Sequence, residues 1–142
     1  MKIYLAAPLF TTAEREFNAR LATRLRTAGH EVFVPQENPA SEPTGKAIFL
    51  KDLAGLVWAD GIVAIMDGAD PDSGTAWECG YAYAMKKPVV LFRSDLRGSG
   101  DAGDIPYNAM LIGAADVHIE IALAPLDVAA DAIIEALAGL GG

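Results

Sequence analysis

The feature that most constrains the fold of this chain is a series of short apolar runs that alternate with helix-like stretches. The runs are rich in β-branched residues and continuously apolar, which is typical of strands buried on both faces of a parallel sheet. The sequence therefore predicts five strands, at Ile3–Ala6, Val32–Pro35, Ile62–Met66, Val89–Phe92 and Val117–Ile121.

Helical patterns fill the segments between these strands. Within residues 11–30, Thr11 and Glu14 have capping-box spacing, and apolar residues recur every four positions before Gly29, a typical helix stop. Further helices are predicted at Lys46–Ala59, Thr75–Lys86 and Asp127–Leu140. This order indicates an α/β fold: a single three-layer, doubly wound domain over residues 1–142, with a five-stranded, mainly parallel sheet of the flavodoxin-like or Rossmann-like kind.

The composition excludes several classes of function. The chain of 142 residues has a formal charge of −8 and no basic run, which disfavours binding to nucleic acid or to an anionic membrane. Its one cysteine, Cys79, excludes an intrachain disulfide and a cysteine-based metal cluster. The N-terminus is not typical of a signal peptide and no apolar run reaches membrane-spanning length, so a cytoplasmic setting is expected.

Two long polar loops, Gln36–Gly45 and Ser94–Tyr107, follow predicted strands. Ligands of doubly wound sheets bind outside the carboxyl ends of the strands, so we expect the site among such loops. The chain has no G-x-G-x-x-G, P-loop or G-x-S-x-G motif, and its two histidines are not spaced to hold a metal. No dinucleotide, metal-ion or serine-nucleophile site is predicted.

Carboxylates remain as candidates for chemistry. Glu78 has no Lys or Arg three or four positions away on its predicted helix, and its neighbours are largely apolar. A first-turn glutamate that interacts with the helix dipole would explain the charge but not these neighbours. Asp72, six residues earlier, is either a helix cap or a second functional carboxylate. One carboxylate that attacks and another that exchanges protons is the arrangement of retaining glycosyl transfer.

The chain resembles the nucleoside 2-deoxyribosyltransferases over nearly its whole length. The similarity lies in IYLAAPLF at 3–10, VPQE at 34–37, Asp52, DSGTAWECGYAYAMKKPVV at 72–90 and YNAM at 107–110. Within it, the D-x-G-T-x-x-E-x-G-x-A pattern that begins at Asp72 is the specific part.

The resemblance implies a role for each matching residue. Glu78 matches the nucleophile that forms a covalent 2-deoxyribosyl ester, Tyr4 the tyrosine that orients it, and Asp72 the aspartate that contacts the base and carries its proton. The expected substrate-binding residues are Asp52 near the sugar hydroxyls, Gln36 and Phe10 at the base, Gly74 in the motif, and Asn108 and Met110, which complete a neighbouring subunit's site. The resemblance thus implies a homo-oligomer that acts on deoxyribonucleosides and free nucleobases, without a metal or organic cofactor.

Three functions follow from this resemblance. The leading one is exchange of the purine or pyrimidine base of a 2′-deoxyribonucleoside with retention, and the alternative is an N-glycoside hydrolase for deoxynucleosides or their 5′-monophosphates. A non-catalytic sensor is disfavoured because Tyr4, Asp72 and Glu78 are all present. The first loop has no arginine before Arg15, which favours unphosphorylated nucleosides, although a later loop offers candidate phosphate contacts at Arg93, Ser94, Arg97 and Ser99.

Overall fold

A computed structural model of the chain describes residues 1–98, 100 and 103–141. Its centre is a five-stranded sheet in the order β2-β1-β3-β4-β5, and every pair of neighbouring strands in it is parallel. This confirms the predicted α/β class, and the strand order is that of flavodoxin-like sheets. The strands are β1 Lys2–Ala6, β2 Glu31–Phe33, β3 Gly61–Ile65, β4 Val89–Arg93 and β5 Val117–Glu120.

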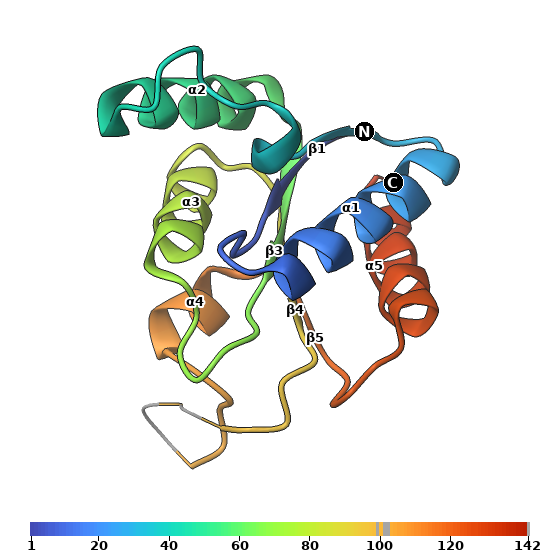
Figure 1. The fold of residues 1–142 in the computed structure, drawn as a ribbon. Helices are drawn as coiled ribbons and strands as arrows, with labels where there is room; N and C mark the ends of the chain where they lie inside the picture. Colours follow the sequence, from blue (N-terminus) through green and yellow to red (C-terminus); the bar gives the residue numbers. More distant parts are fainter. Residues whose placement is uncertain (99, 101–102, 142) are drawn as a thin grey trace.

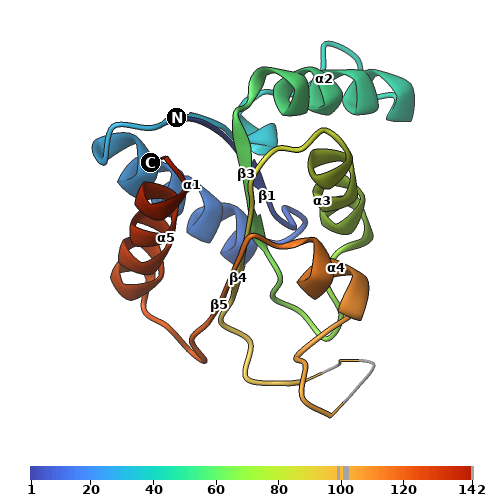
Figure 2. The same ribbon diagram turned by 180° about the vertical axis from the view of Figure 1, so that it is seen from behind.

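Helices cover both faces of the sheet. In Figure 1, α1 and α5 lie on one side of the strands, and α2, α3 and α4 lie on the other. Figure 2 shows the same three layers from behind, with α3 and α4 next to each other. The helices are α1 Thr12–Thr27, η1 Pro35–Glu37 (one turn of 3-10 helix), α2 Gly45–Trp58, α3 Ser73–Ala84, α4 Ala109–Ala114 and α5 Leu126–Leu140.

Alternate residues of β1, β3 and β4 belong to two separate apolar clusters. On β1, Ile3 and Leu5 pack with the cluster under α1 and α5, whereas Tyr4 and Ala6 pack with the cluster under α2, α3 and α4. Both clusters are buried, which explains why these three strands have no polar face in the sequence, whereas the edge strand β5 carries His118 and Glu120. The same alternation directs the Tyr4 side chain toward α3, and the whole residue is inaccessible to solvent.

The ends of several elements differ from the prediction for local reasons. The second strand ends at Phe33 instead of Pro35, because this proline begins the turn η1. The third helix begins at Ser73, two residues earlier than predicted, since Asp72 caps it. The short helix α4 was not predicted; Asn108 caps it, with Oδ1 accepting from the amide of Met110 at 2.9 Å. The capping box of Thr11 and Glu14 is confirmed.

Helix length and hydropathy also bear on membrane association. Among the residues that the structure describes, no helix combines the length and the apolar character needed to cross a bilayer.

We predict that Gly55→Ala destabilises the fold by about 1–3 kcal/mol, the usual cost of overpacking a core. A Cβ at Gly55 on α2 would lie 2.6 Å from Cε1 of Phe33, whose ring stacks on Tyr4 at 5.4 Å. Urea unfolding measures the change. The matched control is Gly139→Ala on α5, where a Cβ meets nothing within 4 Å and the helix should gain about 0.5 kcal/mol. Equal effects of the two substitutions would contradict this packing argument.

Candidate active site

The candidate nucleophile lies in the second turn of α3. Asp72 is the N-cap of this helix, and its Oδ2 accepts from the Thr75 amide at 2.9 Å and from the Thr75 hydroxyl at 3.2 Å. The first turn of α3 contains no acidic residue. The helix dipole is therefore not the explanation for Glu78, because this effect fades beyond the first turn.

Glu78 receives a short hydrogen bond from the core. The Tyr4 hydroxyl donates to Oε1 of Glu78 at 2.6 Å, although the two residues are 74 positions apart in the sequence. Tyr4 comes from β1 and is held by its stacked neighbour Phe33. A rigid donor thus fixes one carboxylate oxygen of Glu78.

Burial dominates the electrostatics of this pair. It raises the pKa of Glu78 to about 7; the hydrogen bond from Tyr4 acts in the opposite direction, and the charges of Asp52 and Asp72 raise the pKa further. Burial also raises the pKa of Asp52. The pKa of Tyr4 is raised far above its ordinary value, first by burial and then by the charge of Glu78, so Tyr4 stays a hydrogen-bond donor.

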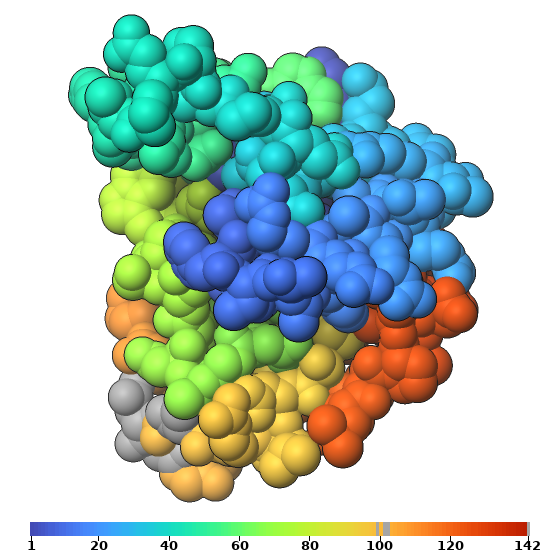
Figure 3. Space-filling model, in the orientation of Figure 1, coloured from blue at the N-terminus to red at the C-terminus, as the bar shows by residue number. Residues whose placement is uncertain are grey.

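A hollow of about 280 Å³ opens onto Glu78 between α2 and α3. In the space-filling view, α2 in teal stands above α3 in yellow-green (Figure 3). The lining residues are Phe49, Asp52, Leu53, Leu56, Gly74, Trp77 and Glu78. The hollow is therefore apolar, with two carboxylates on its wall. It lies between two helices, whereas the sequence predicted a site among the loops at the carboxyl ends of the strands.

A second hollow, of about 300 Å³, shares Asp52 with the first and reaches those loops. It includes Leu9 from the loop after β1 and Gln36 from the segment after β2. The Gln36 amide is held in place, since Nε2 donates to the Arg15 carbonyl at 2.8 Å and Oε1 accepts from Asn18 at 3.2 Å. Asp52 is thus a wall residue of both hollows, of which the first contains Glu78 and the second Gln36.

Five predicted site residues do not line these two hollows. Tyr4 is buried behind Glu78, and Asp72 caps α3; the other three lie farther out. Phe10 is 75% exposed at the start of α1. Asn108 and Met110 line a larger hollow of about 630 Å³ between α3 and α4, together with Asp70, Ser73 and Tyr83. The chain does not bring Asn108 and Met110 into its own Glu78 hollow.

The candidate phosphate contacts after β4 are engaged elsewhere. Arg93 is 0% exposed, the Ser94 hydroxyl donates to Asp67 at 2.7 Å, and Arg97 pairs with Asp95 at 2.6 Å. Ser99 lies outside the described residues. Each of the three described side chains thus already has polar partners, although Arg97 remains 61% exposed.

Two aromatic residues of the Glu78 hollow were not predicted. Trp77 is 50% exposed, stacks on Tyr81 at 5.6 Å and meets the edge of Phe49 at 5.6 Å. The sequence gives only a weak indication of Trp77. It directly precedes Glu78, and Tyr81 lies one helical turn after it, but helices of the core show the same spacing.

Cys79 is fully buried, and burial raises the pKa of its thiol to about 12, which makes it unreactive.

Comparison with known proteins places the chain in a family. A family model described as nucleoside 2-deoxyribosyltransferase matches residues 3–110, and the chain belongs to this family. No match was found among curated proteins.

Among the solved structures that are similar to this chain are three from different organisms. A conserved protein from Enterococcus faecalis V583 is 27% identical, with a TM-score of 0.79 over 98% of both chains. The 2-deoxyribosyltransferase of Bacillus psychrosaccharolyticus is 30% identical, with a TM-score of 0.67 over 89% of this chain and 88% of that one. A Leishmania mexicana enzyme described as a 2-desoxiribosyltransferase shares the fold at 23% identity, with a TM-score of 0.71 over 94% and 97%. The named neighbours are enzymes, as is the family.

We predict that Glu78→Gln stabilises the protein increasingly as pH rises. Below 4.5, the ordinary pKa of a glutamate, Glu78 is protonated in both the folded and the unfolded state, so the substitution changes little. Between 4.5 and about 7 the unfolded chain loses this proton first, which destabilises the wild-type fold. Above that window the gain from Glu78→Gln should approach about 3 kcal/mol in urea unfolding. Glu16→Gln, at an exposed position of α1, is the control, and a pH-independent gain from Glu78→Gln would contradict the prediction.

Proposed function

We propose that this chain is a nucleoside 2-deoxyribosyltransferase, which exchanges the base of a 2′-deoxyribonucleoside through a covalent ester on Glu78. The observation that carries the proposal is the buried pair of Tyr4 and Glu78, joined at 2.6 Å at the wall of an apolar hollow. A carboxylate without a cationic partner and out of bulk water is well suited to attack an electron-poor carbon.

In the first step, an oxygen of Glu78 attacks the anomeric carbon while the bond from that carbon to the base nitrogen breaks. The electron pair of this bond goes to the nitrogen, which takes a proton from Asp72. Tyr4 occupies Oε1 of Glu78, which leaves Oε2 as the attacking oxygen. The ionised carboxylate also stabilises the positive charge that develops on the sugar.

In the second step, a nitrogen of the incoming base attacks the same carbon, and the ester bond to Glu78 breaks. The carboxylate is regenerated, and the proton displaced from the incoming base passes to Asp72. Two inversions give net retention at the anomeric carbon. Each step uses only side chains of this protein and the two bases.

The hollows provide binding surfaces for the two parts of the substrate. Asp52 lines both hollows, and we assign it hydrogen bonds to the sugar hydroxyls next to Glu78. Gln36 and Phe10, toward the loops, are assigned to the base. Gly74 lines the Glu78 hollow beside Trp77, and a residue without a side chain leaves room there for the sugar.

The start of α1 supports an unphosphorylated substrate. Oε2 of Glu14 accepts from the amides of Phe10 at 2.8 Å and Thr11 at 2.7 Å. Free amides at a helix N-terminus would attract a phosphate, but here a carboxylate already occupies them. With Arg93 and Arg97 also engaged, we infer that nucleosides are preferred over their 5′-monophosphates.

We predict that the protein converts deoxyinosine and free adenine into deoxyadenosine and hypoxanthine. Chromatography follows the four compounds, and rapid quenching with intact-mass measurement detects the 2-deoxyribosyl ester. Glu78→Ala should lower the rate at least about 10³-fold and abolish the ester, since it removes the nucleophile. The unfolding transition of the Glu78→Ala variant should remain cooperative, which shows that the loss of activity is not a loss of the fold.

Other products of the same reaction would revise the proposal. Free deoxyribose without deoxyadenosine would make the enzyme a hydrolase, in which water replaces the second base. Turnover of deoxyinosine 5′-monophosphate alone would contradict the inferred substrate class. Binding without turnover of any deoxynucleoside or deoxynucleotide would indicate a sensor and overturn both enzymatic functions.

The hollow between α3 and α4 supports the proposed homo-oligomer. Met110 is 80% exposed and Tyr83 is 63% exposed beside it, so both side chains are accessible to a neighbouring subunit. In the proposed assembly, Asn108 and Met110 reach the site of a neighbouring subunit.

We predict that Met110→Glu weakens this assembly, because the substitution places a charge in an apolar contact. Sedimentation velocity should show the wild-type chain as a multimer and Met110→Glu as a smaller species with reduced turnover. Val128→Glu, at an exposed site on α5 across the sheet, is the control and should sediment like the wild type. A monomeric wild-type enzyme with full activity would contradict the assembly.

A further inference from the structure

A buried arginine at the end of β4 has no part in the chemistry above. Arg93 is 0% exposed, and its guanidinium carbon lies 5.5 Å from the centre of the Tyr107 ring. Among the described residues no carboxylate forms an ion pair with it. Burying a charge without a partner charge is unfavourable, so hydrogen bonds must offset the loss of hydration.

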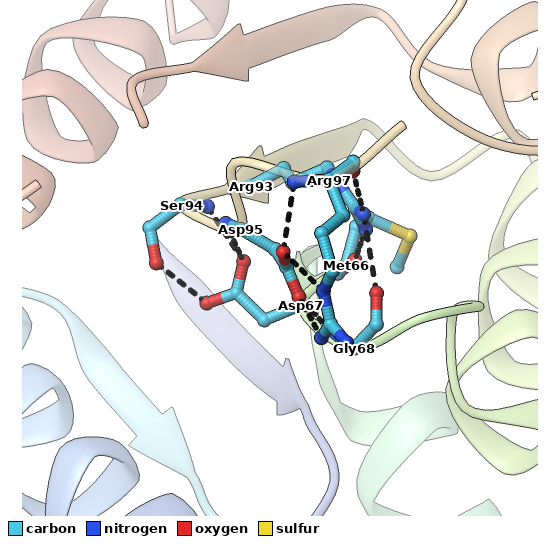
Figure 4. Close-up of polar contacts among 7 residues, drawn as sticks. All are labelled: Met66, Asp67, Gly68, Arg93, Ser94, Asp95 and Arg97. Atoms are coloured by element: carbon cyan, nitrogen blue, oxygen red, sulfur yellow. Dashed lines mark hydrogen bonds and ion pairs between the residues drawn. The ribbon is translucent and has the colours of Figure 1, made fainter. Parts of the chain in front are cut away.

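These hydrogen bonds reach the backbone of two loops (Figure 4). Nη1 donates to the carbonyl of Met66, and Nη2 donates to the carbonyls of Gly68 at 3.1 Å and Arg97 at 2.5 Å. Met66 and Gly68 belong to the loop between β3 and α3, and Arg97 belongs to the loop after β4. One planar group therefore joins the two loops, a geometry that lysine does not reproduce.

Two aspartates tie the same loops together (Figure 4). Asp67 accepts from the Ser94 amide at 2.6 Å, the Ser94 hydroxyl at 2.7 Å and the Asp95 amide at 2.9 Å. Asp95 in turn accepts from the Gly68 amide at 3.2 Å. Gly68 has a φ of +118°, a conformation that favours glycine. Both backbone groups of Gly68 are thus fixed, its carbonyl by Arg93 and its amide by Asp95.

We propose that Arg93 is a positioning residue that sets the place of Asp72 relative to Glu78. Three residues separate Gly68 from Asp72, and Pro71 among them is buried, so a displacement of Gly68 is transmitted to Asp72. Asp72 caps the helix that carries Glu78 and is the proposed carrier of the base proton. The inference rests on the proposed function, because it assigns Asp72 a proton transfer.

The test compares two substrates that differ in their need for this proton. The base of deoxyinosine must gain a proton as it leaves, whereas 7-methyl-2′-deoxyguanosine carries a cationic base that departs as neutral 7-methylguanine. If Arg93 acts through Asp72, Arg93→Met should lower the rate with deoxyinosine by about 10- to 100-fold, the scale of general acid catalysis. Both rates are those of base release in a single turnover, before an incoming base gives its proton to Asp72. With 7-methyl-2′-deoxyguanosine this rate should fall by less than about 3-fold, because the nucleophile is intact.

Four further variants make the result specific. Asp72→Asn should show the same substrate pattern, and the double variant should be no slower than Asp72→Asn within about 2-fold, since both changes remove one function. Arg93→Lys keeps the charge and should show the same pattern with a smaller loss. Arg24→Met, which removes an exposed ion pair to Asp131 between α1 and α5, is the control for loss of an arginine and should show neither effect.

The outcomes separate this inference from the proposed function. Equal losses on both substrates, or no loss in Arg93→Met, would overturn the positioning role. If the wild-type enzyme cleaves neither substrate, the proposed function fails and the role of Arg93 in the reaction fails with it. Hydrogen exchange of the amides at 67–72 then tests the loop contact alone: faster exchange in Arg93→Met than in Arg24→Met supports it, and unchanged exchange refutes it.

Discussion

The hydrogen bond between Tyr4 and Glu78 links the centre of the sheet to the candidate active site. It exists because β1 directs alternate side chains to opposite faces, and because the sheet is covered by helices on both. On the face of α2 and α3, the aromatic ring of Tyr4 fills the core while its hydroxyl reaches the carboxylate of Glu78 on α3. Burial and polarity are thus combined in a single side chain.

Most of the fold can be predicted from local patterns along the sequence. Continuous apolar runs specified the strands, and cap residues such as Thr11 and Glu14 specified a helix start. What was missed depends on contacts between distant segments. Helix α4 is six residues long, too short for an apolar repeat to show. Its cap, Asn108, is also common in turns, and its packing against α3 is visible only in the folded chain.

The candidate site was predictable in part. The residues came from a motif and from the absence of a cation near Glu78, but the hollow between α2 and α3 could not be located, because helix orientation is a tertiary property. Asp72 illustrates a second limit. The sequence left capping and proton transfer as alternatives, whereas the structure shows that Oδ2 caps α3, and among the described residues Oδ1 accepts no hydrogen bond. A single side chain can therefore serve both roles.

The stacking of Phe33 on Tyr4 has a consequence for how the reactivity of this protein can vary. Any side chain at position 55 would collide with the Phe33 ring, and this ring stacks on Tyr4. Tyr4 in turn donates the hydrogen bond that lowers the pKa of Glu78. The acidity of the carboxylate is therefore coupled to the volume of a residue on α2 that has no polar side-chain atom. Substitutions of apolar core residues would therefore change the pH range in which such an enzyme is active, while every polar residue of its site stays the same.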